Sequence, residues 1–373
     1  MILTIKAQGA KMKSNRVHII LFLMFVVCFC LIQWGCKTSP PVPKEMKTSV
    51  PQGNQSELIS VNLGPQKKKS IISLALMGEN CCGQFQPQDP DKIIFLSRQR
   101  LRHPHFQIYQ YDLISLKEKR LSFHDGDDQG VALDPKNQHL VYASLTDSTK
   151  ENPIFLSTIL KKEIRTIPSL GFKPSWSNGD YELYLSENDG SQVERLTQNF
   201  GFDAEPRFTP EGSAIYYTST FEGNSALMEM NIKTKKIRKI IGNNSNYGEV
   251  DIHPQGNKIV FVVYSKDLME SQIALTDSHG KNLQTLTTGP GLKLSPRWFP
   301  GGNKIVYSSN SNNGKNFDLY TIDLNPDLEK KSLPTRLSFL PGNSWLPQPS
   351  PDGSKVLLTN DSSGKLQLYL MPL

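Results

Sequence analysis

The sequence predicts an all-β fold, a β-propeller of four-stranded blades. A short motif returns along the chain, in which an apolar residue leads into a proline turn and a β-branched strand follows. The prolines of this motif lie at positions 90, 135, 210, 254, 300 and 351, and four of the five gaps between them are 44 to 51 residues long. A strand-rich repeat of about 40–45 residues is typical of propeller blades. The motif is clearest in Phe208–Gly212, Ile252–Gly256, Trp298–Gly302 and Pro349–Gly353.

Each repeat contains four candidate strands. The second strand is the most apolar, and its copies are Lys92–Ser97, His139–Ser144, Ala214–Ser219, Lys258–Val263, Lys304–Ser309 and Lys355–Asn360. The third strand is of a Leu-Tyr type, with copies at Gln107–Leu113, Pro153–Ile159, Asp318–Leu324 and Leu366–Leu370. The fourth strand ends in an apolar residue followed by Ser or Thr, as in Arg120-Leu-Ser122. The strands alternate only in part between apolar and polar residues, which suits sheets that are buried on both faces.

The repeats count to seven units, of which the third is truncated; six blades is the alternative. The gap between Pro135 and Pro210 is 75 residues, too short for two complete repeats, and the unit at Pro174–Asp180 lacks its usual second strand. The last unit ends at Leu373 after its third strand. We therefore expect Ser70–Met77 to pair with the final blade and close the ring, which removes an exposed sheet edge.

Residues 1–35 are predicted to be an export signal. Met12 is the more natural start, because a short basic region follows it and leads into a largely apolar stretch of 16 residues, Val17–Ile32, too short for a typical membrane span. Gly35 and Cys36 follow this stretch and resemble a bacterial lipobox, although Gln33 and Trp34 are unusual there. The resemblance implies lipidation of Cys36; plain secretion or an uncleaved anchor is the alternative.

Residues 36–69 are rich in Pro, Ser, Gln and Lys and show no apolar periodicity, which predicts a flexible tether in front of a propeller at 70–373. The formal charge of +7 falls to about +3 once residues 1–35 are removed. So small a charge argues against nucleic-acid binding. Beyond Cys36 the only cysteines are Cys81 and Cys82, which are interpreted as two small apolar residues or as a vicinal disulfide.

Several repeats resemble those of TolB-like propellers. The likeness rests on Phe208-Thr-Pro-Glu-Gly, Ser350-Pro-Asp-Gly-Ser-Lys-Val, Arg195-Leu-Thr, Asn316-Phe-Asp-Leu-Tyr-Thr-Ile-Asp, and Asp180-Tyr-Glu-Leu-Tyr-Leu with Asn188-Asp-Gly-Ser. It covers about residues 80–373, is specific for the fold, and implies a periplasmic or cell-surface binding scaffold. TolB proteins are six-bladed, carry an additional α/β domain and act with the peptidoglycan-associated lipoprotein. We expect no room for that domain between Cys36 and Ser70, so the resemblance is to a lipid-anchored TolB-like propeller.

The sequence offers no hydrolase nucleophile motif, because no Gly-x-Ser-x-Gly pentapeptide occurs. The pair His103 and His105 and the group of His124 with neighbouring aspartates are possible metal ligands, but we interpret them as structural and predict neither a metal nor a cofactor. A binding role without catalysis is therefore expected. The alternative is a carbohydrate-active enzyme, a glycosidase or polysaccharide lyase, with Asp or His at the channel mouth.

Binding residues are sought where the innermost strands begin, about seven residues before each repeat proline. If the repeats superpose, these residues form a ring near one mouth of the channel. The candidates are Asp128, Asp203, Tyr247, Lys293 and Trp345. The other interpretation is that such side chains bond to turn amides within their own blade. We expect a cell-envelope or peptidoglycan-linked protein partner, reached from an anchor at the outer membrane or cell surface, with the inner membrane as the alternative.

Overall fold

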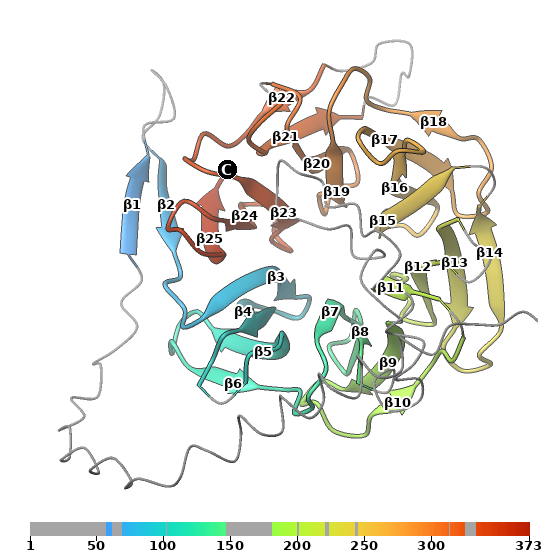
Figure 1. The fold of residues 1–373 in the computed structure, drawn as a ribbon, viewed down its shortest axis with the longest axis horizontal. Helices are drawn as coiled ribbons and strands as arrows, with labels where there is room; N and C mark the ends of the chain where they lie inside the picture. The colour runs from blue at the N-terminus through green and yellow to red at the C-terminus, as the bar shows by residue number, and fades with distance from the viewer. Residues whose placement is uncertain are drawn as a thin grey trace, which may run out of the picture. The chain divides into compact units, whose positions relative to one another are not determined.

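The computed structural model describes residues 57–61, 69–101, 103–146, 181–199, 201–220, 224–242, 245–312, 314–324 and 333–373. Every regular element in these residues is a β-strand. The strands form six antiparallel sheets, arranged as blades around a centre (Figure 1). The predicted β-propeller is therefore confirmed. Across the residues so described, no helix is long and apolar enough to cross a membrane.

The blades are numbered along the chain, and the strands of each run from the centre outward. Blade one is β3 (Glu79–Gln86), β4 (Asp89–Arg98), β5 (Gln107–Asp112) and β6 (Glu118–Arg120); blade two is β7 (Asp128–Leu133), β8 (His139–Ser144), β9 (Glu182–Glu187) and β10 (Glu194–Arg195); blade three is β11 (Asp203–Phe208), β12 (Ala214–Ser219), β13 (Ala226–Asn231) and β14 (Ile237–Ile241). Blade four is β15 (Asn246–Ile252), β16 (Lys258–Tyr264), β17 (Ser271–Asp277) and β18 (Gln284–Thr285); blade five is β19 (Lys293–Trp298), β20 (Lys304–Ser309), β21 (Asp318–Asp323) and β22 (Thr335–Arg336); blade six is β23 (Ser344–Pro349), β24 (Lys355–Asn360), β25 (Gln367–Pro372), β2 (Lys69–Ser73) and β1 (Glu57–Val61).

The described strands make six blades, so the count of seven units was wrong and the six-bladed alternative holds. The strand that follows the unit at Pro174, β9, pairs along its whole length with β8 and is the third strand of blade two. β8 and β9, which both lie between Pro135 and Pro210, therefore belong to one blade. The strand expected at Pro153–Ile159 lies outside the described residues.

The ring is closed as predicted, by the first strands of the propeller on the last blade. β2 pairs antiparallel with β25, with Ile72 opposite Leu370 and Ser73 opposite Tyr369. Ile71 is fully buried, in the cluster that lies between blades five and six. β1 pairs in turn with β2 and makes blade six five-stranded. This strand lies within the segment 36–69, in which no strand was expected.

The hydrophobic core lies between the blades. In β4 the side chains of Ile93, Ile94 and Phe95 are all fully buried, because both faces of the sheet are covered by neighbours. Clusters of buried residues cross from blade to blade; Tyr216 of blade three, for example, packs with Phe261 of blade four. This arrangement explains why the second strands read as continuous apolar runs in the sequence.

The short outer strands are held by a repeated side-chain lock. The hydroxyl of Ser122 accepts a hydrogen bond from the backbone N–H of Ile108 at 2.8 Å, and Thr287 accepts one from Ile273 at 2.9 Å. Equivalent bonds join Leu183 to Thr197 at 2.9 Å and Leu319 to Ser338 at 2.8 Å. The Ser or Thr at the end of each of these repeats therefore fastens the outer strand to the third strand. At the other side of each sheet, the innermost strand forms the edge of the blade.

Candidate functional site

The innermost strand of every blade contains a β-bulge at the same place. The pairing of each of these strands with its neighbour shifts register over two residues. The first residue of each bulge has a left-handed backbone, with φ between 53° and 61°. These six residues, here called ring one, are Cys82, Gly130, Glu205, Glu249, Ser295 and Leu346. A bulge bends its strand and re-aims side chains. Five of the six residues are not glycine, although that backbone region disfavours side chains.

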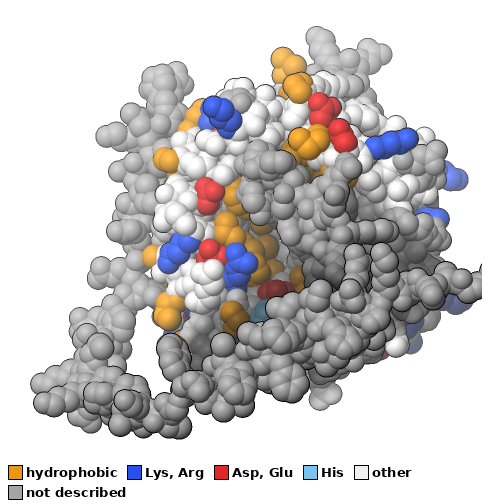
Figure 2. Space-filling model, in the orientation of Figure 1, with side chains coloured by type: hydrophobic (Ala, Val, Ile, Leu, Met, Phe, Trp, Pro, Cys, Tyr) orange, Lys and Arg blue, Asp and Glu red, His pale blue; other side chains and the backbone are white. Residues whose placement is uncertain are grey.

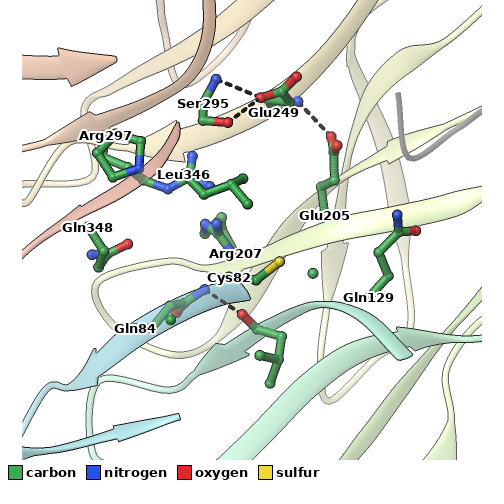
Figure 3. Close-up of a pocket in the computed structure, with 14 residues that line it drawn as sticks. Cys82, Gln84, Gln129, Glu205, Arg207, Glu249, Ser295, Arg297, Leu346 and Gln348 are labelled. Carbon is green, nitrogen blue, oxygen red and sulfur yellow. Dashed lines mark hydrogen bonds between the residues drawn. The ribbon is translucent and has the colours of Figure 1, made fainter. Parts of the chain in front are cut away.

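The bulges surround a cavity of about 100 Å³ at the centre of the propeller (Figure 3). All of ring one contributes to its wall. A second layer is formed by the residues two positions further along each strand; this ring two contains Gln84, Ala132, Arg207, Asp251, Arg297 and Gln348. Four of its members also line the cavity: Gln84, Arg207, Arg297 and Gln348. The central channel therefore brings together charged and polar side chains from several blades.

One side of the cavity is acidic and belongs to blades three to five. The Glu249 carboxylate accepts hydrogen bonds from the Ser295 backbone N–H at 2.6 Å and from the Ser295 hydroxyl at 2.8 Å, and Tyr264 donates to its other oxygen. Glu205 in turn accepts from the Glu249 backbone N–H at 2.7 Å and from Thr218 at 3.1 Å. Burial, together with the charge of Glu205, raises the pKa of Glu249 to about 7.

Two arginines from the same blades lie in ring two, on either side of Asp251. Nε of Arg207 lies 3.9 Å from Oδ1 of Asp251, while Oδ2 of Asp251 accepts from the Trp298 backbone N–H at 2.8 Å. Arg297 is only 8% exposed, and one of its terminal nitrogens donates to the carbonyl of Pro296 at 2.7 Å. Burial and the positive charge of Arg297 lower the pKa of Arg207 to about 9.

The opposite wall is largely apolar and comes from blades six and one. It contains Cys82, Gly83, Leu346 and Pro347. In Figure 3 the end of the Arg207 side chain lies between Leu346 and Cys82. Apolar side chains are also visible in the hollow near the centre of the face shown in Figure 2. Cys81 and Cys82 are free thiols in this structure, with their sulfur atoms 2.6 Å apart.

The five residues predicted for the channel mouth lie at the beginnings of the innermost strands, but their side chains do not line the cavity. Asp203 is fully buried and accepts from Asn199 at 2.6 Å. The Lys293 ammonium donates to the carbonyls of Gly289 and Pro290 at 2.6 and 2.7 Å. Tyr247 packs edge-on against Phe261, and Trp345 edge-on against Phe317. The contacts of these four side chains lie within the described part of the propeller.

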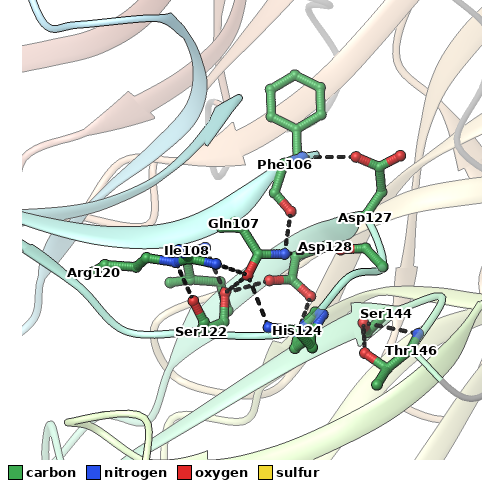
Figure 4. A network of polar contacts seen from close by, with 11 residues as sticks. Phe106, Gln107, Ile108, Arg120, Ser122, His124, Asp127, Asp128, Ser144 and Thr146 are labelled. Atoms are coloured by element: carbon green, nitrogen blue, oxygen red, sulfur yellow. Dashed lines mark hydrogen bonds and ion pairs between the residues drawn. The ribbon is translucent and has the colours of Figure 1, made fainter. Parts of the chain in front are cut away.

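Asp128 belongs to a buried network between blades one and two (Figure 4). Its carboxylate accepts from Ser122 at 2.5 Å and lies 2.9 Å from Nε2 of His124. Ser122 and the backbone N–H of His124 also reach the amide oxygen of Gln107, each at 3.3 Å. Burial raises the pKa of Asp128, although the nearby His124 opposes the shift. This network fastens a loop to blade one and is closed off from the channel cavity.

The histidines proposed as possible metal ligands do not gather. Nε2 of His103 is 2.7 Å from the Tyr109 hydroxyl, and Nδ1 of His105 is 3.6 Å from Asp127. Within the nine described stretches no group of three or more His, Cys, Asp or Glu side chains is placed to hold a metal ion.

The residues of the acidic and basic walls were missed from the sequence, but a signal for them exists. In blades two to six, ring one lies five residues and ring two three residues before the repeat proline, as with Glu205 and Arg207 before Pro210. Counting back from the repeat proline and taking every second residue, instead of searching at the start of each strand, would have found them, because side chains of a strand alternate between its faces. Blade one departs from this spacing, because Pro90 lies eight residues after Cys82.

The comparisons with known proteins agree with this architecture. A family model described as the TolB beta propeller domain matches residues 172–325. This chain carries a TolB-like β-propeller. Three curated relatives of the TolB-like propeller match over shorter segments. An uncharacterized protein of Agrobacterium fabrum is 29% identical over 138 residues, which cover 34% of this chain and 46% of that protein.

The other two relatives carry TolB names. A TolB homolog of Chlorobium chlorochromatii is 27% identical over 132 residues, covering 35% of this chain and 29% of that protein. The Tol-Pal system protein TolB of Rickettsia massiliae is 34% identical over 108 residues, covering 29% and 23%. The TolB-like propeller therefore spans less than half the length of the curated relatives that it matches.

Solved structures share the fold of the TolB-like propeller. A TolB candidate from Agrobacterium tumefaciens has a TM-score of 0.54 at 13% identity, over 80% of this chain and 91% of that one. An oligogalacturonate lyase from Vibrio parahaemolyticus has a TM-score of 0.52, also at 13% identity, over 85% and 98%. At such identities the likeness shows the fold alone, and the lyase activity belongs to the Vibrio protein.

Proposed function

We propose that this chain is a cell-envelope binding scaffold of the Tol-Pal kind, which holds a protein or peptidoglycan-linked partner on a face of its propeller. The observation that carries the proposal is the central cavity of about 100 Å³, with charged side chains on one wall and apolar ones on the other. TolB names among the relatives support the envelope setting. Interfaces gain most of their energy from a few side chains that fill small desolvated pockets, and a cavity of this size suits one such side chain.

Two features favour binding over catalysis. The carboxylates of Glu205 and Glu249 are engaged in hydrogen bonds to the next blade, so they act as joints between blades. The cavity is also well below the roughly 300–1,000 Å³ of pockets that enclose small-molecule ligands. A substrate such as an oligosaccharide is therefore expected not to fit inside this central cavity. We accordingly propose a role without catalysis, cofactor or nucleic acid.

Site-specific photocrosslinking in intact cells tests the proposal. A photoreactive amino acid at Leu346, which lines the cavity, is expected to capture a defined envelope protein. The same amino acid at Ile114, which is 75% exposed on the outer part of blade one, is the matched control and should not capture it. Mass spectrometry of the crosslinked product identifies the partner. Equal capture from both positions, or none from either, would contradict a partner at the channel.

We further propose that Cys36 carries a lipid anchor at the outer membrane or cell surface; this residue lies outside the described part of the chain. The Cys36→Ala variant is expected to move the protein from the detergent phase to the aqueous phase in a phase-partition assay. Cys82→Ala, which alters a thiol inside the propeller, should leave the partition unchanged. Recovery of the Cys36→Ala protein in the detergent phase would show that something else anchors it.

A carbohydrate-active enzyme remains the second candidate, and one observation favours it. Burial raises the pKa of Glu249 to about 7, which is a range suited to a general acid or base near neutral pH. Incubation with oligogalacturonate or peptidoglycan fragments, followed by analysis of the products, separates the two functions. Turnover that is lost in Glu249→Gln would establish the enzyme; partner capture without turnover supports the scaffold.

A further inference from the structure

Ring two is rich in hydrogen-bond donors. Arg207, Arg297, Gln84 and Gln348 all present N–H groups, whereas Asp251 supplies the only carboxylate of this layer. The guanidinium groups of the two arginines each have one short bond to a preceding carbonyl, at 3.0 Å for Arg207 and 2.7 Å for Arg297. Such forks bind carboxylates through two parallel N–H···O bonds, so the layer has donors to spare for an additional acceptor.

The acids of the cavity do not use up these donors. Glu205 and Glu249 accept from backbone N–H groups and hydroxyls of blades three to five. Asp251 accepts from the Trp298 backbone, and its nearest contact with Arg207 is 3.9 Å long. The side-chain amide of Gln348 makes no hydrogen bond to another residue that the structure describes, while its backbone pairs with β24. Because Arg297 is only 8% exposed, water compensates its charge poorly; Asp251 and Glu249 compensate part of it. The guanidinium N–H groups that are not bonded to Pro296 can bind a further acceptor, and an anionic one suits a buried cation.

The shape of the cavity limits what that partner can be. A volume of about 100 Å³ is equivalent to roughly three waters of bulk liquid. Blades six and one contribute apolar surface to the wall, from Leu346, Pro347 and Gly83, next to the amides of Gln84 and Gln348. A short side chain that has an apolar stem and a charged end matches both walls, whereas the several hydroxyls of a sugar ring would face Leu346 and Pro347 without hydrogen bonds.

From this geometry we infer that the cavity receives one carboxylate of a partner polypeptide, an Asp or Glu side chain or a chain terminus, held between Arg207 and Arg297. The inference rests on the proposed scaffold function and names the chemistry by which its central pocket recognises the partner. Gln348 completes the site as a neutral donor from the facing blade. The carboxylate stem lies against Leu346, which lines the same cavity as Arg207.

Thermal melting of the full chain with small probes tests the inference. N-acetyl-glutamate N-methylamide at fixed ionic strength is expected to raise Tm, because a ligand that binds only the folded state stabilises it. The glutamine analogue, which lacks the charge, should not. Arg297→Gln is expected to weaken the glutamate probe about tenfold or more. Arg238→Gln makes the same exchange at an exposed ion pair on the outside of blade three and should leave the effect intact.

Gln348→Met provides a second variant that avoids disturbing the buried charges. It retains the length of the side chain, removes the amide donor, and is expected to weaken the probe by several-fold. Equal Tm shifts with the glutamate and glutamine probes, or a glutamate shift that survives in both cavity variants, would overturn the inference. A shift with digalacturonate alone would assign the site to a uronic acid and would also overturn it.

The two proposals fail separately. If Arg297→Gln still crosslinks the envelope partner from position 346 as well as the wild type does, the scaffold function stands and the carboxylate site is wrong. If the wild type captures no partner at all, the scaffold function is wrong, whatever the small probe does.

Discussion

The carboxylate of Glu249 in blade four holds the backbone N–H of Ser295 in blade five at 2.6 Å. One blade earlier, Glu205 holds the backbone N–H of Glu249 at 2.7 Å. Two consecutive bulges, those at Glu249 and Ser295, are therefore each fixed by a side chain of the bulge before it. The other half has Cys82, Gly130 and Leu346 at the same positions and cannot form such bonds. The polar half should be the more rigid part of the channel.

We predict that Glu249→Gln lowers the free energy of unfolding by about 1–3 kcal/mol. Tyr264 and Ser295 donate to different oxygens of the carboxylate, and an amide places an NH2 group at one of these two positions, so one buried donor loses its acceptor. Urea denaturation measures the change. Glu194→Gln, at an exposed ion pair with Lys235, is the matched control and should alter stability by less than about 0.5 kcal/mol. Equal effects of the two variants would show that the joint between blades is not stabilising.

Stability should fall as pH rises from about 4.5 to 7. Burial raises the pKa of Glu249 and of Glu182 to about 7 in the folded chain, whereas a glutamate in the unfolded chain titrates at about 4.3. Between these values the folded chain binds more protons than the unfolded chain, so the free energy of unfolding decreases with pH and levels off above about 7.

Urea titrations at several pH values from about 5 to 8 measure this decline, which should be shallower in a Glu182→Gln, Glu249→Gln double variant. Burial lowers the pKa of His103 and of His253 and acts in the opposite direction near neutral pH. Both proteins keep these histidines, so the difference between them isolates the glutamates. A wild type and a double variant with parallel pH profiles would contradict the prediction.

Closure of the ring should depend on Ile71. Ile71→Ala is expected to cost about 2–5 kcal/mol, because the side chain is fully buried next to β25. Met77→Ala, six residues later and 59% exposed, should be nearly neutral. Thermal and urea denaturation of the two variants give the comparison. If Ile71→Ala unfolds like the wild type, β2 contributes little to the seam.

The contribution of each Ser or Thr hydrogen bond that fastens an outer strand should be measurable separately. Thr287→Val retains shape but removes the acceptor for the Ile273 backbone N–H, with an expected cost of about 1–3 kcal/mol. Thr234→Val, in an exposed turn of blade three, is the control; its hydroxyl bonds only to neighbouring turn residues. Hydrogen exchange at the Ile273 amide should speed up in Thr287→Val alone. Unchanged protection at that amide would mean that the strand does not need the hydroxyl.

The strands that are buried along almost their whole length could be predicted from the sequence. The predicted second strands Ala214–Ser219 and Lys304–Ser309 are found as β12 and β20 with the same bounds. Pairing of the first strand with the last was also predictable, because the final repeat lacked its outer strand. In both cases the physical signal, a continuous apolar run or a missing partner, lies in the residues themselves.

The candidate site was not predictable in the same way, because a bulge breaks the regular alternation on which strand reading depends. The search stopped at the strand starts, where Asp203 and Lys293 are buried within the propeller. The cavity residues Glu205 and Arg297 lie two and four positions further on. Pairing register decides which of these faces the centre, and register follows from neighbours that one strand alone does not reveal.

The pairing of Ile72 with Leu370 joins nearly the two ends of the propeller. During synthesis β2 emerges among the first strands of the propeller, while β25, its partner, is the last of the described propeller strands to be made. Such a non-local contact is slow to form, since the whole intervening chain must be ordered first. Blade six therefore cannot be completed before the ribosome has released β25, and until then the apolar edges of the open ring need protection from aggregation.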